Sequence, residues 1–395
     1  MRKKGFVLRN FNARALKSAV FSTISVLRPL RDYLNYYQDM ECFELRAQKG
    51  SLRSLEIRPV EEYGIRFSEA EISDILRDCD TSSDALKLVY KMARIGDVTV
   101  LGSSGVSVCN RSRKVLYLDG TAGRTPRNWL VARPLQAVDG DETATYINLL
   151  GVRRGHRHFA HFFWDTLVPV MVFVKNWLDP AERIVFLVRE DLSAIQRDAF
   201  RFLAEDYPNV SFQPLAADRK LHCSSSIYLA AQHLYYGVAN TMAREYMRAL
   251  AKLFLKHYDI AAPAPDAGKR LYISREGAEL RKPKNEAQLM KMLSRYGFES
   301  YDTAKLPFAE QARLFQSADV VVAPHGAALA NLMFCRPHTK VLEFFPANYR
   351  DDCFLRLSKA MELEYHYHFG ERGDFPKLPF RMDEESLETL VRALL

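Results

Sequence analysis

Between residues 271 and 345, short apolar runs alternate with longer stretches in which apolar residues recur at helical spacing. The run VVVA after Asp319 has no polar alternation, which is typical of a strand buried on both faces of a parallel sheet. Asn285 with Gln288 predicts a helix-capping box, and Gly297 is placed as a helix-ending glycine. The pattern predicts strands at 271–274, 298–302, 319–323 and 340–345, and helices at 286–296, 308–317 and 327–334.

The preceding part of the chain carries a weaker form of the same alternation. A linker-like stretch, APAPDAG, spans 262–268, and we place the domain boundary near residue 240. The resulting divisions are a basic arm at 1–40, an N-terminal domain at 41–240 and a C-terminal domain at 241–395. Before the linker, we predict helices at 68–78, 83–94, 158–176, 192–205 and 241–258, strands at 184–188, 210–213 and 225–229, and short β-type runs between 97 and 147.

Polar residues recur where the predicted parallel strands end, and ligands of such sheets bind at that edge. Arg275 follows the first strand, His325 and Gly326 follow the third, and Glu343 lies near the end of the fourth. Gly326 also opens a helix, whose free N–H groups and positive dipole end suit a phosphate. With Arg275 or Arg281 as a forked cationic partner, this edge is suited to a pyrophosphate. Glu343 would accept hydrogen bonds from ribose hydroxyls or pair with an internal arginine.

Two further positions of this edge belong to the predicted nucleotide contact. Ala327 is the first residue of the helix that Gly326 opens, so its N–H group would face the phosphate. Asn331 lies about one turn further in and would either contact the ligand or bond the backbone near the loop. His325 would donate a hydrogen bond to the pyrophosphate or offset its charge, and the alternative is a histidine that caps the turn.

A second group of polar residues comes earlier, in the stretch HFAHFFWDTLVP. His158, His161 and Asp165 share one face if this stretch is helical, because residues three and four apart are neighbours. Asp165 or His161 could serve as a general base for a hydroxyl group, or the two could bond each other and orient the site. A zinc site that includes His156 is the other chemical alternative.

The block ISR…R…NE…GF…EQ…LF…ADVVVAPHGAALANLMF…VLEFFP resembles glycosyltransferase family 61, which includes bacterial capsular polysaccharide biosynthesis proteins. The stretch from His158 to Pro169 is similar to the upstream motif of that family, and the resemblance covers roughly residues 145 to 350. It implies a GT-B fold, with two Rossmann-like domains facing a central cleft, and an inverting transfer without a required metal or cofactor.

On this resemblance, residues 241–395 would bind a nucleotide-sugar donor, with UDP as the expected nucleotide. Residues 41–240 would bind the acceptor, a capsular or other surface polysaccharide or its lipid-linked precursor. Asp165, His161 and His325 would then be catalytic, while Arg275, Arg281, Gly326, Ala327, Asn331 and Glu343 would contact the donor. The alternatives are a non-catalytic nucleotide-sugar-binding subunit of a polysaccharide assembly complex and a zinc-dependent enzyme that uses His156, His158 and His161.

The net charge of +8 comes from the beginning of the chain, because residues 1–31 hold eight basic residues and no acidic one. The rest of the chain has 48 basic and 48 acidic residues, which argues against a nucleic-acid-binding body. Leu16, Val20, Ile24 and Leu27 recur at helical spacing within this arm. The arm would therefore either contact an anionic membrane surface or pack on the protein itself.

The six cysteines are dispersed without a C-x-x-C pair, which is typical of reduced thiols in a cytosolic protein. No apolar run approaches the roughly eighteen residues that a transmembrane helix requires. We therefore expect a cytoplasmic protein whose arm could bring it to the inner face of the membrane.

Overall fold

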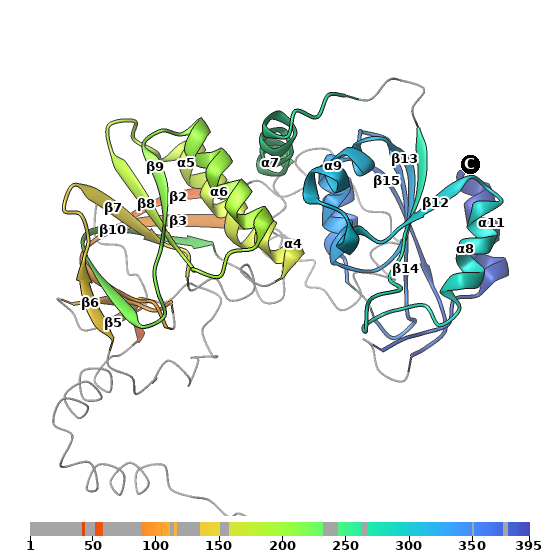
Figure 1. The fold of residues 1–395 in the computed structure, drawn as a ribbon, viewed down its shortest axis with the longest axis horizontal. Coiled ribbons are helices and arrows are strands. Elements are labelled where there is room, and N and C mark those ends of the chain that lie inside the picture. Colours follow the sequence, from red (N-terminus) through yellow and green to blue (C-terminus); the bar gives the residue numbers. More distant parts are fainter. Residues whose placement is uncertain are drawn as a thin grey trace, which may run out of the picture.

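The computed structural model places most of the chain in two α/β halves that lie side by side (Figure 1). The basic arm lies outside the described part of the chain, so its predicted helix has no structural account. The described residues are 42–43, 52–57, 88–103, 105–110, 114–116, 135–150, 158–231, 244–262, 268–349, 351–373 and 378–395.

A ten-stranded mixed sheet forms the first half, in the order β1-β5-β4-β3-β10-β7-β8-β9, with β2 on β3 and β6 on β10. β7, β8 and β9 run parallel to one another, whereas the long strands β3 and β10 pair antiparallel. The strands are β1 Cys42–Phe43, β2 Leu52–Ile57, β3 Leu88–Leu101, β4 Ser107–Cys109, β5 Lys114–Leu116, β6 Gln136–Asp139, β7 Ala144–Asn148, β8 Arg183–Val188, β9 Val210–Pro214 and β10 Arg219–Ala231.

The helices of the first half connect its parallel strands. β7 leads through α4 (Phe159–His161), η3 (Phe162–Leu167) and α5 (Val168–Asn176) to β8, and α6 (Ala194–Asp206) leads from β8 to β9. α6 begins with a full capping box between Ser193 and Gln196. α5 is buried along almost its whole length because it lies between the sheet and α7 (Arg244–His257), so its residues are apolar all round.

The second half is a five-stranded sheet in the order β12-β11-β13-β14-β15, and all its neighbouring strands are parallel. The predicted strands and their parallel pairing are confirmed, with a further strand at the β14 edge. The strands are β11 Lys269–Ile273, β12 Phe298–Tyr301, β13 Ala318–Pro324, β14 Lys340–Phe345 and β15 Glu364–Phe369.

Helices cover both faces of this sheet, which explains its continuous apolar runs. Val320 and Val322 pack on one face against α8 and α11, while Val321 and Ala323 belong to the core on the other face with α9, η6 and α10. The helices are α8 Glu286–Ser294, η5 Thr303–Lys305, α9 Phe308–Gln316, η6 Ala327–Phe334, α10 Cys353–Ala360 and α11 Glu384–Leu394.

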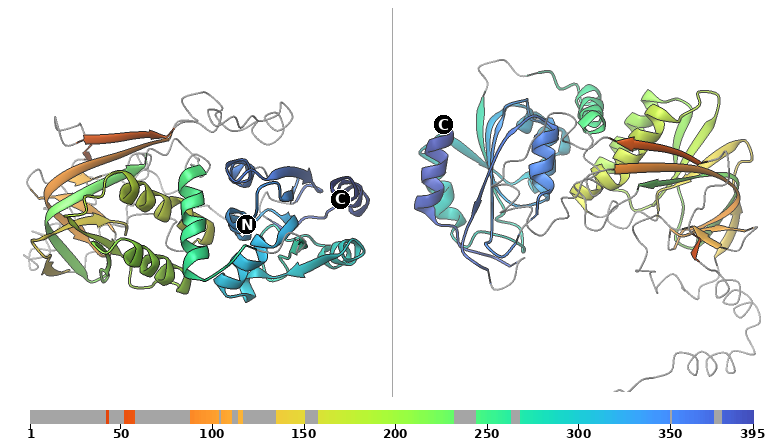
Figure 2. Two further views of the ribbon diagram at one scale, coloured as in Figure 1. Left: turned by 90° about the horizontal axis from the view of Figure 1, so that it is seen from above. Right: turned by 180° about the vertical axis from the view of Figure 1, so that it is seen from behind.

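The two halves share one continuous hydrophobic core where α4 and η3 meet the second half. Phe163 lies 5.7 Å from Phe308, and Trp164 lies 6.2 Å from Phe354, between ring centroids. α7 lies between the halves (Figures 1 and 2), where it contacts α5, α6 and η6. From α7, Arg244 reaches Glu362 of the second half, so an ion pair also crosses the junction.

Two local predictions were wrong. Residues 88–94, predicted as helix, belong to strand β3, where pairing with β10 overrides a helical apolar pattern. Asn285 makes no capping box, because its side chain bonds the backbone of Met382 instead. By contrast, the helix predicted at 327–334 is confirmed, and it is a 3₁₀-helix. Gly297 has φ of +76°, the left-handed conformation expected of a helix-ending glycine.

Some predictions concern residues outside the described ranges. The predicted helix at 68–78 and the domain boundary near residue 240 fall there, so the boundary stays a prediction.

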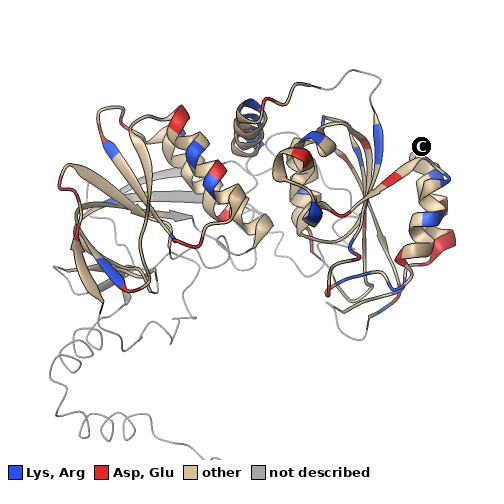
Figure 3. Cartoon of the chain, in the orientation of Figure 1, with Lys and Arg blue, Asp and Glu red and all other residues tan. Residues whose placement is uncertain are grey.

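Acidic and basic residues are interspersed over both halves in Figure 3, in line with the balanced charge of the chain beyond residue 31. Among the described residues, every helix falls short of the length and apolar content that crossing a membrane requires.

Candidate active site

Two arginines meet at Gly326, where strand β13 gives way to helix η6. A Cβ atom on Gly326 would lie 1.7 Å from Nη1 of Arg275, so only glycine leaves room for this guanidinium. The Arg275 guanidinium donates to the carbonyl of Leu280 at 2.8 Å, and Arg281 donates to the carbonyl of His325 at 3.3 Å. Within the described part of the chain, neither arginine forms an ion pair with a carboxylate.

The backbone N–H of Arg275 is held by the side chain of Glu286. One carboxylate oxygen of Glu286 accepts the Arg275 N–H at 2.7 Å and the Tyr272 hydroxyl at 3.0 Å. Glu286 is the first residue of α8 and is only 4% exposed. Burial, together with the charge of Arg281, lowers the pKa of Arg275 to about 10, which leaves the side chain cationic at neutral pH. The result is a concentration of positive charge at the start of η6.

His325 is held by a buried carboxylate from the next strand. Nδ1 of His325 lies 2.6 Å from Oε1 of Glu343, and the Tyr365 hydroxyl donates to Oε2 of Glu343 at 2.6 Å. Glu343 has no exposed surface, and burial raises its pKa against the opposing effects of His325 and Tyr365. A ribose could not reach this carboxylate in the observed arrangement. The structure thus gives Glu343 neither of its predicted partners, because a histidine and a tyrosine occupy its oxygens.

Asp351 lies on the other side of the His325 ring, and the sequence analysis did not identify it. Its Oδ2 is 3.9 Å from Nε2 of His325 and accepts the Tyr349 hydroxyl at 3.1 Å. Burial acts to raise the pKa of Asp351, but His325 and the hydrogen bonds from Cys353 and Tyr349 outweigh it and keep that pKa low. Arg281 lies over the Tyr349 ring at 4.9 Å. His325 is therefore flanked by two carboxylates and approached by one arginine.

Asn331 and Ala327 differ in their access to this edge. The amide of Asn331 donates to Gln311 at 2.9 Å and to the carbonyl of Ala328 at 3.0 Å, and the residue has no exposed surface. Asn331 therefore ties η6 to α9 and lies out of reach of a nucleotide in this arrangement. Ala327 is partly exposed and is the first residue of η6, where N–H groups have no partner within the helix.

The second group of polar residues, His161 and Asp165, lies in the first half of the molecule. Nδ1 of His161 is 2.8 Å from Oδ2 of Asp165, which places the two side chains within hydrogen-bonding distance. The side chain of His161 is 11% exposed and that of Asp165 is 17% exposed. The pair is therefore largely screened from solvent, in keeping with a histidine oriented by a carboxylate.

This pair is carried by an irregular helix. Residues Phe162–Leu167 form a π-helix between α4 and α5, and segments of this kind are frequent at functional sites. The wider turn buries Phe162, Phe163 and Trp164 together while Asp165 stays partly exposed. The helix predicted at 158–176 is confirmed over Phe159–Asn176, and nothing in the local apolar pattern indicates its π-helical part.

An aromatic contact links the two groups of polar residues. The Trp164 ring lies 6.2 Å from His161 and 6.2 Å from Phe354, and the Phe354 ring lies 5.3 Å from His325. Trp164 is 1% exposed, and its Nε1 has no hydrogen-bond partner among the described residues. A buried donor without an acceptor is uncommon in folded proteins and marks a place that ligand binding or a change of conformation could satisfy.

The alternative site of three histidines is only partly described. His156 lies outside the described residues, so this alternative remains untested. His158 is exposed and caps α4, since its Nδ1 accepts the His161 N–H at 3.5 Å. Its ring also lies 4.6 Å from that of His161.

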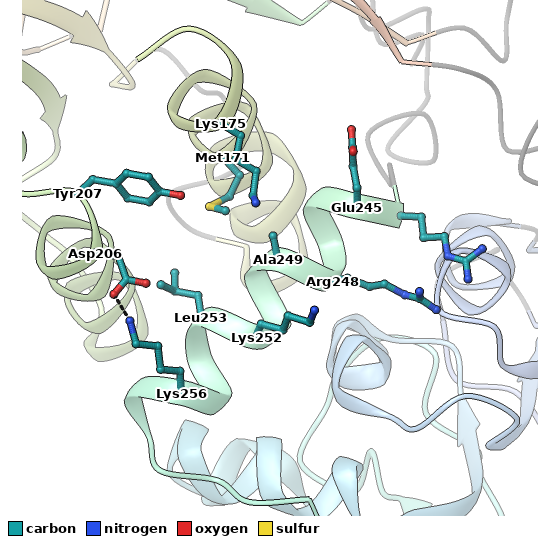
Figure 4. A pocket seen from close by; sticks show the side chains of 11 residues that line it. Met171, Lys175, Asp206, Tyr207, Glu245, Arg248, Ala249, Lys252, Leu253 and Lys256 are labelled. Carbon is teal, nitrogen blue, oxygen red and sulfur yellow. Dashed lines mark hydrogen bonds and ion pairs between the residues drawn. The ribbon is translucent and has the colours of Figure 1, made fainter. Parts of the chain in front are cut away.

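A separate cavity of about 570 Å³ lies between α5, α6 and α7 (Figure 4). Lys256 pairs there with Asp206, and Arg248 pairs with Glu362 of the second half. None of the residues expected to be catalytic or to bind the donor lines this cavity. Its lining is basic around an apolar floor, and it consists of Met171, Lys175, Asp206, Tyr207, Arg244, Glu245, Arg248, Ala249, Lys252, Leu253 and Lys256.

Comparison with known proteins agrees with the expected family. Residues 159–342 match the family model described as glycosyltransferase 61. A β-1,2-xylosyltransferase of Oryza sativa subsp. japonica is 43% identical over 63 residues, which are 16% of this chain and 12% of the plant protein. The EGF domain-specific O-linked N-acetylglucosamine transferases of Pan troglodytes and Mus musculus are each 30% identical over 125 residues, which are 30% of this chain and 23% of theirs.

The chain thus spans less than a quarter of the length of these relatives, and their names include two different sugars. The matched residues run from the start of α4 to the middle of β14 and include His161, Asp165 and most of the polar residues at the edge of the second sheet, whereas Glu343 lies just beyond the match. Residues 159–342, a little under half of the chain, thus match glycosyltransferase family 61.

Proposed function

We propose that this protein is an inverting glycosyltransferase that binds a nucleotide-sugar donor at the carboxyl edge of its second sheet. One observation carries the proposal: Arg275 and Arg281 converge on Gly326 without a carboxylate partner in the described part of the chain. Two guanidiniums at the start of a helix suit a diphosphate, because both the charge and the backbone N–H groups favour an anion.

His325 would act on the same diphosphate. With Nδ1 directed at Glu343, its Nε2 is the nitrogen that remains for a ligand oxygen. Charge that develops on the leaving diphosphate would be stabilised by donors already in place, which is the most effective form of electrostatic catalysis. In this proposal Glu343 and Tyr365 are positioning residues, since they act through His325.

The base for the reaction would be His161, oriented by Asp165. The acceptor hydroxyl would give its proton to Nε2 of His161 while its oxygen forms a bond to the anomeric carbon of the donor sugar. The bond from that carbon to the diphosphate oxygen would break in the same step, and its electron pair would leave with the diphosphate. A carboxylate on Nδ1 would hold the imidazole in the required tautomer and stabilise the cation that forms.

The wider assignment rests on the family match and on the architecture. The two α/β halves meet near the His161–Asp165 pair and the residues around His325. This agrees with a GT-B arrangement, in which donor and acceptor bind opposite domains. We propose UDP as the nucleotide, no metal in the transfer step, and a surface polysaccharide or its lipid-linked precursor as the acceptor. The four described free cysteines agree with a cytoplasmic location.

The basic arm would add a peripheral contact with anionic membrane. We expect the full chain to bind vesicles that contain an anionic phospholipid, and its eight basic residues before position 32 to account for that binding. Replacing these eight residues by glutamine should abolish the binding, and raising the salt should weaken it in the unaltered protein. Equal binding by both proteins would rule the contact out.

Donor binding is tested by titrating the full-length protein with UDP, GDP and ADP and measuring heat and thermal stability. Arg275→Ala should weaken binding of the preferred nucleotide by about 10- to 100-fold, because a charge-assisted hydrogen bond contributes roughly 1.5–3 kcal/mol. The matched control is Arg270→Ala, since Arg270 is an exposed arginine at the opposite end of the same strand. Unchanged binding by Arg275→Ala and by His325→Ala, with both proteins folded, would overturn the donor site.

Turnover then separates an enzyme from a binding subunit. Hydrolysis of the donor sugar or its transfer to a glycan should be lost in His161→Ala while nucleotide binding is retained. Nucleotide binding without any turnover in the unaltered protein, across a panel of donors and glycans, would favour a non-catalytic subunit.

A further inference from the structure

Three different metal-ligating side chains meet at one point beside His325. A ring nitrogen of His325, a carboxylate oxygen of Asp351 and Sγ of Cys353 all lie within 4.8 Å of one another. The distance from Nε2 of His325 to Oδ2 of Asp351 is 3.9 Å. The three residues come from two separate elements, because His325 follows β13 whereas Asp351 and Cys353 lie at the start of α10.

These separations suit one small metal ion. Donor atoms around a tetrahedral zinc ion lie about 3.3 to 3.8 Å apart, because zinc–ligand distances are about 2.0 to 2.3 Å. The histidine nitrogen and the aspartate oxygen already lie close to this range. The thiol lies at most 4.8 Å from either of them, which is about 1 Å beyond this range.

The surroundings of His325 also match those of a metal-bound histidine. A histidine that ligates a metal through one nitrogen usually donates its other ring N–H to a carboxylate, which fixes the ring. Nδ1 of His325 lies 2.6 Å from Glu343, and Tyr365 in turn holds the second oxygen of that carboxylate at 2.6 Å. Tyr349 and the Cys353 N–H hold Asp351 in place from the other side. Two of the three ligands are thus oriented before any ion arrives.

The ligand set has a balanced charge. A zinc ion, the Asp351 carboxylate, a Cys353 thiolate and a neutral His325 sum to zero in formal charge. A mixed set of nitrogen, oxygen and sulfur ligands favours zinc, or cobalt in its place, over magnesium or calcium, which prefer oxygen alone. Three protein ligands leave a fourth position for water, as in zinc sites that are open to solvent.

We propose that His325, Asp351 and Cys353 form a binding site for a zinc-type divalent cation. Occupancy of the site engages Nε2 of His325, the nitrogen that the proposed function assigns to the donor diphosphate. Zinc therefore excludes the nucleotide sugar and inhibits transfer, and this consequence rests on the proposed function. The binding itself does not, since it requires only the three ligands.

The site is tested by titrating zinc, and cobalt as a coloured substitute, into the metal-free full-length protein under reducing conditions without nucleotide. Asp351→Asn and Cys353→Ser should each weaken zinc binding at least tenfold, and Cys353→Ser should also remove the thiolate–cobalt absorption. The matched control is Cys335→Ser, which changes another buried, free cysteine outside the group. Since zinc can bind elsewhere on the chain, the comparison among variants is decisive.

Zinc binding of equal strength by the unaltered protein, Asp351→Asn and Cys353→Ser would overturn the site, as would cobalt spectra that Cys353→Ser leaves unchanged. A competition experiment addresses the consequence separately. Zinc should weaken UDP binding to the unaltered protein and leave it unaffected in Cys353→Ser. If zinc binds through these three residues and UDP binding stays the same, the metal site stands and the donor role of His325 is wrong.

Discussion

Nδ1 of His325 lies 2.6 Å from Oε1 of Glu343, and the two side chains are 5% and 0% exposed. The pair joins the residue after β13 to the middle of β14, its parallel neighbour. A buried carboxylate needs hydrogen-bonding partners, and Glu343 has one on each oxygen. The orientation of His325 therefore depends on Glu343 and Tyr365, which are buried, rather than on residues exposed at the sheet edge.

Tyr365→Phe tests whether His325 depends on the support that Tyr365 gives to Glu343. The substitution removes the hydroxyl that donates to Oε2 of Glu343 and leaves that buried oxygen without a donor. We expect a loss of about 1 to 3 kcal/mol in the free energy of unfolding, measured by urea denaturation. The turnover number should also fall while the affinity for nucleotide changes little, because Tyr365 acts only through His325.

Tyr301→Phe is the control for this experiment. Its hydroxyl donates to Glu299 at an exposed site, where the loss of a hydrogen bond is compensated by water. A Tyr365→Phe protein as stable and as active as Tyr301→Phe would show that the hydroxyl does not support Glu343.

Gly326→Ala should weaken nucleotide binding with little loss of stability. The new Cβ would lie 1.7 Å from Nη1 of Arg275, so the end of this flexible side chain must move. The backbone of Gly326 is extended, with φ of −178°, so alanine introduces no backbone strain. We expect the affinity for nucleotide to fall at least tenfold by calorimetry. Gly277→Ala is the control, because its Cβ would make an ordinary contact of 3.6 Å with Asp302.

Asp165→Asn and His161→Ala should separate the roles of the two residues. If His161 accepts the proton, His161→Ala should leave almost no transfer, whereas Asp165→Asn should retain measurable activity with a misdirected imidazole. Both variants should bind the nucleotide normally, since neither residue contacts the proposed donor edge. Near-normal turnover in both variants would move the search for the base elsewhere, and activity lost only in Asp165→Asn would make the aspartate the base.

The stability that Asp206 gives to the contact between α6 and α7 should depend on pH. Burial acts to raise the pKa of Asp206, but hydrogen bonds from Lys256 and His257 outweigh it and hold that pKa below its usual value. A carboxylate with a lowered pKa contributes stability above its unfolded pKa of about 3.9, and this contribution disappears as the pH falls through the folded pKa.

Asp206→Asn should therefore reduce the free energy of unfolding by up to about 1 kcal/mol near pH 7. The difference from the unaltered protein should shrink as the pH falls below about 4. Urea denaturation at several pH values measures this difference, and Asp218→Asn, at a residue 72% exposed, is the control. A difference that is constant with pH would mean that Asp206 acts by packing alone.

The sequence by itself determined the second sheet and the residues at its edge. Its strands are short apolar runs buried on both faces, so their positions follow from local composition, and parallel strands end at a common edge. Arg275 and Gly326 follow the ends of adjacent parallel strands, β11 and β13, which is why their meeting was predictable. The match to the family was also predictable, because the matching motifs are contiguous segments of the chain.

Tertiary packing alone decided how each of these residues is held. The partner of Glu343 on its second oxygen is Tyr365, 22 residues further along, and Asp351 faces His325 from the start of another helix. The contact of Trp164 with Phe354 joins the two halves across 190 positions of sequence. A local pattern shows that a side chain will be buried, but the group that satisfies it depends on which distant segments pack together. For this reason the sequence revealed the candidate chemistry of His325, whereas only the folded chain revealed the two carboxylates that flank it.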